Sequence, residues 1–300
     1  MNNPASAIIG WIGTGILGSA IVEQLLSKHF QVKIYNRTKN KCKPLVDQGA
    51  IQADSILDIL HCETIFVCLG NEDAFQELIL ANAPYLDVTQ KKITLIDLST
   101  TSPDFAIDVS KRLQAFNISY LESPVSGGQE GAKNGTMTAI CAGDLDVFGQ
   151  AVILLKHFCS SVHYVGNNGD AQKLKIINNL AESINLHGAS EVVSLGLKLG
   201  FDIDTLRAVL TTARGKSAYM DILLNRLAEN IEHVAVTLDV RTKDLFLAHA
   251  LLKQTELDLV LSKMTIDLFE ATKKVFGAQA DQTECFHHIQ NKINTPIIIG

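Results

Sequence analysis

Short apolar runs alternate with helix-like spacing through the first half of the chain. Apolar residues follow helical spacing over 16–26 and again over 73–80. The apolar runs are typical of buried strands, and they span residues 7–12, 32–35, 64–69, 93–96, 120–121, 138–141 and 162–165. Repeated alternation of strand and helix indicates a doubly wound parallel sheet with helices on both faces. We therefore expect an α/β domain over residues 1–165.

The spacing of apolar residues changes after Gly169. Leu174, Ile177 and Ile184 belong to a series at three-residue and four-residue intervals, which predicts a long helix ending near residue 199. Asp202 is a candidate N-cap for a further helix, and the pattern stays helical to about residue 277. We therefore expect an all-α C-terminal domain over residues 166–300.

Composition and charge exclude several classes of protein. The 300 residues are 47% hydrophobic and carry a formal charge of −6, without the clustered Lys and Arg that bind nucleic-acid phosphates. The longest apolar runs are far shorter than the roughly 18 residues of a membrane span. The N-terminal Met-Asn-Asn-Pro-Ala-Ser lacks the basic start and apolar core of a signal peptide. We expect a cytoplasmic protein that binds neither nucleic acid nor membrane.

Metal and disulfide chemistry has little support in the sequence. The six cysteines form no C-x-x-C pair and are expected to be reduced thiols. Among the nine histidines, only His287 and His288 are adjacent, and neighbours on a helix do not face one ligand sphere. We therefore expect neither a disulfide framework nor a metal site.

A glycine-rich turn, Gly13-Thr-Gly-Ile-Leu-Gly18, stands between the first predicted strand and helix. In that context G-x-G-x-x-G is the fingerprint of a Rossmann-like dinucleotide site, because glycines permit the tight turn, the approach of a pyrophosphate and close helix packing. The helix N-terminus adds a dipole that favours the anion. The alternative is a turn that binds nothing. The expected cofactor contacts are Gly13, Thr14, Gly15, Ile16, Leu17 and Gly18.

The end of the second strand indicates which dinucleotide is bound. NAD sites place Asp or Glu here for the ribose hydroxyls, whereas this chain has Asn36-Arg37-Thr38. Without a carboxylate to repel it, a ribose phosphate can bind the planar guanidinium of Arg37, with Asn36 and Thr38 as further donors. We expect NADPH to be preferred over NADH. Alternatively, Arg37 is a solvated residue at the start of a basic stretch.

A serine-glycine segment follows the predicted strand at 120–121. It runs from Glu122 through Ser126, Gly127 and Gly128 to Ala132. The Ser126 hydroxyl and the backbone amides beside the two glycines form a suitable cradle for a small carboxylate. The alternative is an ordinary tight turn between strands.

Lys175 and Asn179 stand four residues apart in the predicted long helix, so they share one face and can reach the same substrate. They end the segment Gly166-Asn-Asn-Gly-Asp-Ala-Gln-Lys-Leu-Lys-Ile-Ile-Asn-Asn179. A solvated helix lysine is the alternative reading of Lys175.

The glycine-rich turn and these two segments together resemble the β-hydroxyacid dehydrogenase family. The resemblance covers nearly the whole chain, and the family includes 3-hydroxyisobutyrate dehydrogenase, tartronate semialdehyde reductase and glyoxylate/succinic semialdehyde reductase. It implies catalytic roles for Lys175, Asn179 and Ser126, with Ser126, Gly127 and Gly128 binding the substrate. It also implies further cofactor contacts at Cys68, Leu69, Gly70, Thr100 and Lys243.

The chain departs from the family pattern at three positions. Ala171 replaces the usual third glycine of the lysine segment, Gly70 replaces a usual proline, and Val236 stands where many members have phenylalanine. Loss of that aromatic side chain widens the expected pocket. Residues 36–50 are similar to the glyoxylate/succinic semialdehyde reductase branch, whereas the Ser126 segment is closer to the family at large. The sequence therefore does not assign the chain to one branch.

The resemblance implies hydride transfer between NADPH and the carbonyl carbon of a small carboxylate-bearing substrate, either a semialdehyde or glyoxylate. Lys175 is the expected proton donor and stabilises the charge that develops on the oxygen. An imine reductase-like enzyme and a non-enzymatic NADP-binding scaffold are the alternatives, and both are disfavoured by Lys175, which such proteins generally lack. By analogy with the family, we expect a homodimer or homotetramer.

Overall fold

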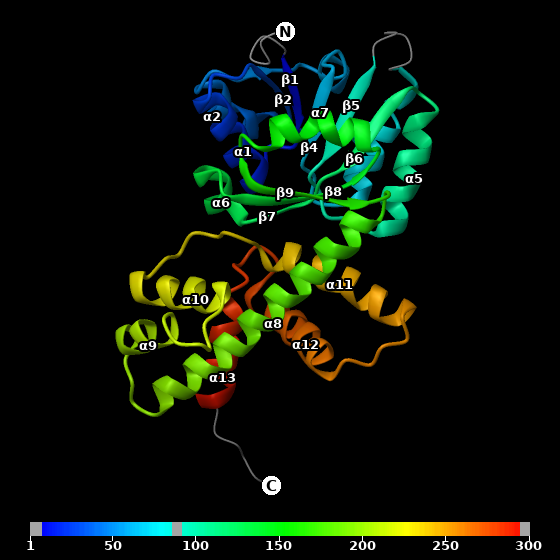
Figure 1. Ribbon diagram of the computed structural model, residues 1–300. Helices are drawn as coiled ribbons and strands as arrows, with labels where there is room; N and C mark the ends of the chain where they lie inside the picture. The colour runs from blue at the N-terminus through cyan, green and yellow to red at the C-terminus, as the bar shows by residue number, and fades with distance from the viewer. Residues whose placement is uncertain (1–7, 86–91, 295–300) are drawn as a thin grey trace. The chain divides into compact units, whose positions relative to one another are not determined.

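The computed structural model describes residues 8–85 and 92–294 (Figure 1). The chain divides into two compact units, Met1–Lys175 and Ile176–Gly300. One helix, α8 (Asp170–Lys198), begins in the first unit and continues into the second. The boundary expected near residue 165 therefore stays a prediction. Residue 7 of the first predicted strand, the N-terminal segment and the tail 295–300 lie outside the described residues.

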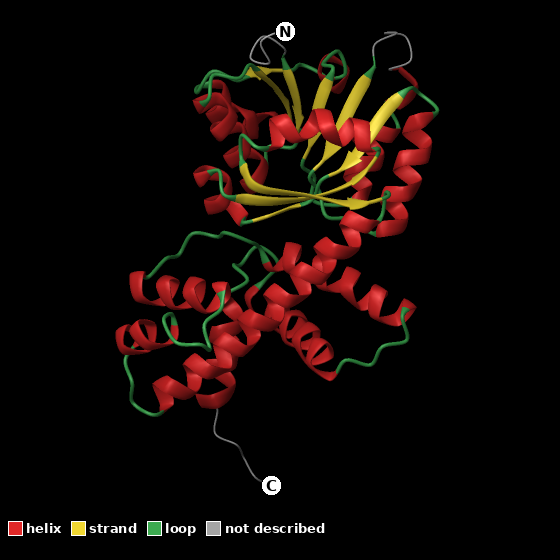
Figure 2. Cartoon of the chain, in the orientation of Figure 1, coloured by secondary structure: helices red, strands yellow, loops and turns green. Residues whose placement is uncertain are grey.

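The first unit contains one nine-stranded sheet (Figure 2). Its strands are β1 (Ile9–Ile12), β2 (Val32–Tyr35), β3 (Ile51–Gln52), β4 (Thr64–Val67), β5 (Ile93–Asp97), β6 (Ile118–Glu122), β7 (Val125–Ser126), β8 (Met137–Gly143) and β9 (Cys159–Gly166). They lie in the order β3-β2-β1-β4-β5-β6-β8-β7, with β9 paired to β8. All neighbours from β3 to β6 are parallel, whereas β8 is antiparallel to β6 and β7.

Helices cover both faces of this sheet, as the alternation predicted. They are α1 (Ile16–Ser27), η2 (Lys39–Cys42), α2 (Lys43–Val46), α3 (Ile56–Ile59), α4 (Glu72–Phe75), η3 (Gln76–Leu80), η4 (Ala83–Tyr85), α5 (Pro103–Gln114), α6 (Gly128–Asn134) and α7 (Leu145–Leu155). Successive side chains of a strand point to opposite faces. Accordingly, Trp11 packs in the core cluster that includes α1 and α7, while Ile12 packs in the cluster that includes α3 and α5. The Rossmann-like fold is confirmed.

The regular elements of the second unit, within residues 176–294, are all helices. After α8 come α9 (Ile203–Leu210), α10 (Ala218–Glu229), α11 (Leu238–Gln254), α12 (Val260–Phe276) and α13 (Glu284–Asn294). As predicted, Asp202 caps α9, and its side chain accepts from the Thr205 backbone N–H. The apolar core includes Leu186, Leu223 and Phe269. No helix within the described ranges has the length and hydropathy to cross a membrane.

The long helix α8 is confirmed, but the apolar series that predicted it is not its buried face. Leu174 and Ile177 are 43% and 57% exposed, whereas Lys175 and Asn179 are only 6% and 3% exposed. Further along, buried serines of α8 donate to carbonyls one turn earlier, as Ser183 does to Asn179. This back-bonding satisfies hydroxyls that have no water available, so a polar stripe can be buried.

Candidate active site

The glycine-rich turn has the local geometry that its sequence predicted. Gly13 has φ +98°, and a Cβ there would lie 2.1 Å from the Cys68 carbonyl oxygen. A Cβ on Gly18 would lie 2.2 Å from the Gly13 carbonyl oxygen, so this glycine lets α1 pack against the turn. Gly15 differs, because a Cβ added there would have nothing within 4 Å. The space in front of Gly15 is therefore open to a ligand that approaches the backbone.

The N-terminus of α1 suits an anion. Gly15 is its N-cap without a capping side chain, and the first turn contains no acidic residue. Such a helix end presents backbone N–H groups and the positive end of the dipole. A dinucleotide pyrophosphate therefore fits this end of α1.

The segment after β2 is held partly by its own side chains. Asn36 Oδ1 accepts from the Thr14 backbone N–H at 3.1 Å, and Asn36 Nδ2 donates to the Thr38 carbonyl at 3.0 Å. Asn36 thus ties the segment to the glycine-rich turn. Arg37 is exposed and forms a 3.0 Å ion pair with Glu77, forty positions later in the chain. Sequence reasoning missed Glu77, since no local pattern links it to Arg37.

Two loops at the carboxyl ends of β4 and β5 carry the next expected cofactor contacts. The Leu69 backbone N–H donates to Ser99 Oγ at 3.0 Å, which links residues 68–70 to the Thr100 loop. Gly70 is exposed, and nothing lies within 4 Å of its Cβ position. Thr100 is half-buried between Ser99 and Thr101. The structure therefore brings residues 68–70 and Thr100 to one edge of the sheet.

The serine-glycine segment forms a tight connection from β7 into α6. Ser126 is half-buried at the end of β7, and Gly127 and Gly128 have φ +130° and +61°. These values lie in the left-handed range, which a side chain at either position would strain. A Cβ on Gly127 would also come within 3.3 Å of the Met137 Cα. The geometry accounts for both glycines and leaves the carboxylate cradle as a prediction.

Lys175 and Asn179 lie one turn apart on α8 and are both buried. Buried lysine is rare in proteins unless it is paired or functional. Asn179 Nδ2 donates to Asp244 Oδ2 at 2.8 Å, and Lys243 Nζ lies 3.0 Å from Asp244 Oδ1. Asp244 therefore connects two expected site residues, Asn179 and Lys243, within the second unit. Its position beside Lys243 was the only sequence signal for it.

A buried arginine anchors the same stretch of α8. The Arg241 guanidinium donates to the Asn179 carbonyl at 3.1 Å and to Glu182 Oε2 at 2.9 Å. It also donates to the Tyr219 hydroxyl at 2.8 Å and the Gln282 side-chain oxygen at 2.7 Å. Burial raises the pKa of Tyr219 to about 12, so its hydroxyl stays protonated and donates to Glu182. This network was not visible in the sequence because its members are up to a hundred residues apart.

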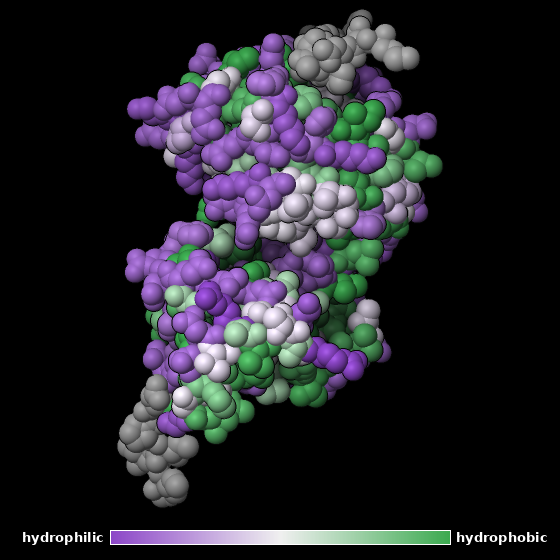
Figure 3. Space-filling model, turned by 60° about the vertical axis from the view of Figure 1, so that its left-hand side comes forward, coloured by the Kyte–Doolittle hydropathy of each residue, from purple (hydrophilic) through white to green (hydrophobic). Residues whose placement is uncertain are grey.

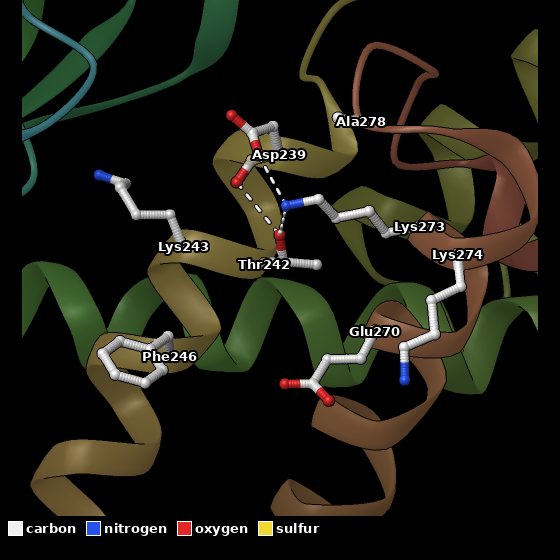
Figure 4. Close-up of a pocket in the computed structure, with 8 residues that line it drawn as sticks. All are labelled: Asp239, Thr242, Lys243, Phe246, Glu270, Lys273, Lys274 and Ala278. Carbon is white, nitrogen blue, oxygen red and sulfur yellow. Dashed lines mark hydrogen bonds and ion pairs between the residues drawn. The ribbon is translucent and has the colours of Figure 1, made fainter.

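Lys243 also lines a hollow of about 540 Å³ between α11 and α12 (Figure 4). Phe246 lies beside it on α11, while Lys273 projects from α12 and donates to Asp239 Oδ1 at 2.6 Å. The remaining lining residues are Thr242, Glu270, Lys274 and Ala278. Two acidic and three basic side chains therefore line the hollow. No group of three metal-ligating side chains occurs among the residues that the structure describes.

Comparison with known proteins identifies both units. Residues 8–166 match the family model of the NAD binding domain of 6-phosphogluconate dehydrogenase. Residues 169–289 match the model described as NAD-binding of NADP-dependent 3-hydroxyisobutyrate dehydrogenase. Both models describe nicotinamide-dinucleotide dehydrogenases. The chain belongs to the β-hydroxyacid dehydrogenase family, as its motifs predicted.

Two relatives with near full-length similarity to this chain have very different names. The chain is 24% identical over 294 residues to the cytokine-like nuclear factor N-PAC of Drosophila pseudoobscura pseudoobscura, with 94% of this chain covered. It spans only 47% of the length of that protein. It is 25% identical over 277 residues to 2-(hydroxymethyl)glutarate dehydrogenase of Eubacterium barkeri, covering 92% of each chain.

Solved structures share the fold over nearly the whole chain. Psf3 in complex with NADP+ and 2-OPP is 36% identical, with a TM-score of 0.88 and coverage of 94% of this chain and 99% of that one. An imine reductase from Myxococcus stipitatus is 17% identical, with a TM-score of 0.61 over 94% of this chain and 99% of its own. The imine reductase likeness extends to the fold alone.

Proposed function

We propose that the protein is an NADP-dependent oxidoreductase that transfers a hydride between NADPH and the carbonyl carbon of a small aldehyde acid, and in reverse from the corresponding β-hydroxyacid. The observation that carries the proposal is Lys175, buried on α8 within the matched family segment and one turn before Asn179. The name of the Eubacterium barkeri relative, a hydroxyacid dehydrogenase, supports the reaction class.

The residues of the glycine-rich turn fit a dinucleotide. Gly15 leaves space for the pyrophosphate, and the first turn of α1 has no carboxylate to repel it. The bound nicotinamide supplies the hydride, and the protein supplies position and charge. Thr100, Lys243 and residues 68–70 are the further contacts that we propose for the cofactor.

The preference for NADPH rests on the segment after β2. It contains no acidic residue and offers the exposed guanidinium of Arg37. A ribose phosphate replaces Glu77 as the partner of that guanidinium, and a bidentate phosphate contact is stronger than an exposed carboxylate pair. The NADP+ bound to the 36% identical Psf3 supports this preference.

The proposed proton transfer is made by Lys175. Its ammonium faces the negative charge that develops on the carbonyl oxygen and then delivers a proton to that oxygen. In the oxidation direction the neutral amine accepts the hydroxyl proton. Asn179, held by Asp244 at 2.8 Å, orients the substrate or the lysine on the same helix face. Ser126 with the amides at Gly127 and Gly128 binds the substrate carboxylate.

The helical unit also presents apolar side chains at its surface (Figure 3). Leu195, Leu199, Val260 and Met264 are each more than half exposed in the single chain. The homodimer or homotetramer that the family resemblance implies would cover such side chains, and it stays a prediction.

The test follows oxidation of NADPH and, separately, of NADH by loss of nicotinamide absorbance. The substrates are glyoxylate, succinic semialdehyde, tartronate semialdehyde and methylmalonate semialdehyde. We expect turnover with NADPH and at least one of them, and loss of turnover in Lys175→Ala. Lys173→Ala, two positions away and exposed, is the matched control and should keep full activity. Turnover of cyclic imines alone, or unchanged activity in Lys175→Ala, would contradict the proposal.

A further inference from the structure

The start of α8 is held by a residue from the sheet. Glu122 ends β6 and is fully buried. Its Oε1 accepts from the Gly169 backbone N–H, and its Oε2 accepts from the Gln172 backbone N–H at 3.2 Å. A helix normally takes such acceptors from its own N-cap side chain. Here the acceptors come from a carboxylate forty-seven positions earlier, on a rigid strand.

A second anchor acts on the same helical turn. The Gln172 side chain is fully buried, and its Oε1 accepts from the Thr101 backbone N–H at 3.0 Å. Its Nε2 donates to the Ser99 carbonyl at 3.1 Å. One amide therefore binds the backbone on both sides of Thr100, which is a proposed cofactor contact. A side chain that satisfies both neighbours of a residue fixes the position of that residue's backbone.

Both anchors act on Gln172, which lies within one turn of Lys175. Gln172 is three residues before the lysine, so the two side chains share a helix face. We propose that Glu122 and Gln172 are positioning residues that together set Lys175 against the cofactor loop at Thr100; we call the pair the α8 clamp. The inference rests on the proposed function, because it assigns the clamp to the placement of the proton donor. Misplacement of a reacting group by about 1 Å can cost about 100-fold in rate.

The charge on Glu122 determines how many hydrogen bonds its carboxyl accepts from the start of α8. Burial raises the pKa of this carboxyl to about 7, and the backbone N–H donors of Gly169 and Gln172, together with the Asn168 side chain, oppose the rise. As a carboxylate it accepts from both donors. A proton on either oxygen points toward one of these N–H groups, so the hydrogen bond from that group is lost.

Three elements, β6 itself and the β5 and α8 that bond to it, carry ionisable groups near Glu122 in the chain or the sheet. On β5, Asp97 is its paired neighbour, and on β6 Tyr120 donates to Asp97 at 3.0 Å. The first two turns of α8 carry Asp170, Lys173 and Lys175. The paired position on β8 is Ala142, which is not ionisable. Asp97 favours the protonated form of Glu122 through charge repulsion.

The test compares Glu122→Gln and Gln172→Met with the wild type, Lys175→Ala and the exposed control Lys173→Ala. We expect kcat to fall about 10-fold to 100-fold in each clamp variant, with the KM for NADPH unchanged in Glu122→Gln, which keeps the Gln172 bonds beside Thr100. The ratio of wild-type to Glu122→Gln kcat should be largest above pH 7 and should shrink below it. The reason is that the glutamine amide, like the protonated carboxyl, accepts only one of the two hydrogen bonds. A ratio that is flat with pH, or unchanged kcat in both folded variants, overturns the inference.

Amide hydrogen exchange over residues 167–175 separates failure of the clamp from failure of the proposed function. If the wild type turns over none of the substrates, the proposed function fails, and exchange alone tests the clamp. We expect faster exchange of this segment in Gln172→Met than in Lys173→Ala, with the rest of the chain unchanged. Equal exchange overturns the clamp. If Glu122→Gln does not fold, amide exchange in Gln172→Met and the pH dependence of exchange in the wild type still test the clamp.

Discussion

At the scale of single residues, the three glycines of the turn have different structural roles. Gly13 and Gly18 are required by the protein itself, since a Cβ on either would collide with a backbone carbonyl. Gly15 has an ordinary φ of −75° and open space around its Cβ position. No neighbouring atom of the protein therefore requires a glycine at this position. The sequence motif predicted all three positions and the different role of each, with the open approach at the second glycine.

Substitution of two of these glycines separates folding from cofactor binding. Gly15→Val should lower the free energy of unfolding by no more than about 1 kcal/mol, because its Cβ has no protein atom within 4 Å and the main cost is a poorer N-cap. It should weaken NADPH binding at least tenfold by blocking the pyrophosphate. Gly13→Ala should destabilise the fold by more than about 1 kcal/mol, because its φ is +98°. Thermal unfolding and fluorescence titration with NADPH measure both effects. Equal NADPH affinity of Gly15→Val and wild type would place the cofactor elsewhere.

Arg37 and Glu77 make opposite contributions to the choice of dinucleotide. Arg37→Ala should raise the KM for NADPH at least tenfold and leave the KM for NADH unchanged, because only NADPH carries the ribose phosphate. Glu77→Gln should lower the KM for NADPH by no more than about fivefold, since an exposed ion pair contributes less than about 1 kcal/mol. Steady-state kinetics with both cofactors measure these changes. Parallel losses for both cofactors in Arg37→Ala would disprove discrimination by this residue.

At the scale of elements, periodicity predicted which segments form helices and strands, but not the contacts that hold these elements in place. Apolar runs located seven of the nine strands of the sheet, because buried strands are rich in apolar residues. The two-residue strands β3 and β7 are too short to show any period. In α8 the apolar series predicted the helix, although much of that series is exposed and the buried face combines apolar with polar side chains. That face depends on partners such as Glu122 and Asp244, which are distant in the sequence and join the helix only after folding.

Arg241 is the residue whose removal should harm α8 most. Its guanidinium bonds both the Asn179 carbonyl and Glu182, and its side chain is buried. Arg241→Met should lower the free energy of unfolding by about 3 to 5 kcal/mol, because it leaves the Glu182 carboxylate without its cation. Arg207→Met, which removes the half-buried partner of the exposed Asp204 and Glu229, is the matched control and should change it by less than about 1 kcal/mol. Chemical denaturation measures both. Similar values for the two variants would show that the network contributes little.

At the scale of the whole molecule, the fold class, the family and the conformation of the glycine-rich turn followed from the sequence. They could be predicted because each depends on a local pattern: apolar runs, a six-residue turn, and lysine and asparagine one helical turn apart. Three features could not be predicted, namely the antiparallel β6–β8 and β7–β8 pairings, the Arg37–Glu77 ion pair and the anchoring of α8. Each of them joins residues that are distant in the chain.

The raised pKa of Glu122 predicts how stability changes with pH. Its folded value of about 7 exceeds the ordinary 4.5, mainly because the carboxyl is buried. The folded state therefore binds this proton more tightly, so the stabilisation is complete below about pH 4.5 and is lost as pH rises through about 7. Across that window the wild type should lose about 3 kcal/mol of unfolding free energy relative to Glu122→Gln. Denaturation curves at a series of pH values measure the difference, and parallel pH dependence of the two proteins would contradict it.

The most direct test of the account follows the hydride itself. NADPH that carries deuterium at the transferable position of the nicotinamide is incubated with the protein and each aldehyde acid, and the hydroxyacid product is analysed by mass spectrometry. We predict one deuterium on the former carbonyl carbon with the wild type and with Lys173→Ala, and no product with Lys175→Ala. Product without deuterium, or labelled product formed equally well by Lys175→Ala, would contradict hydride transfer assisted by this lysine.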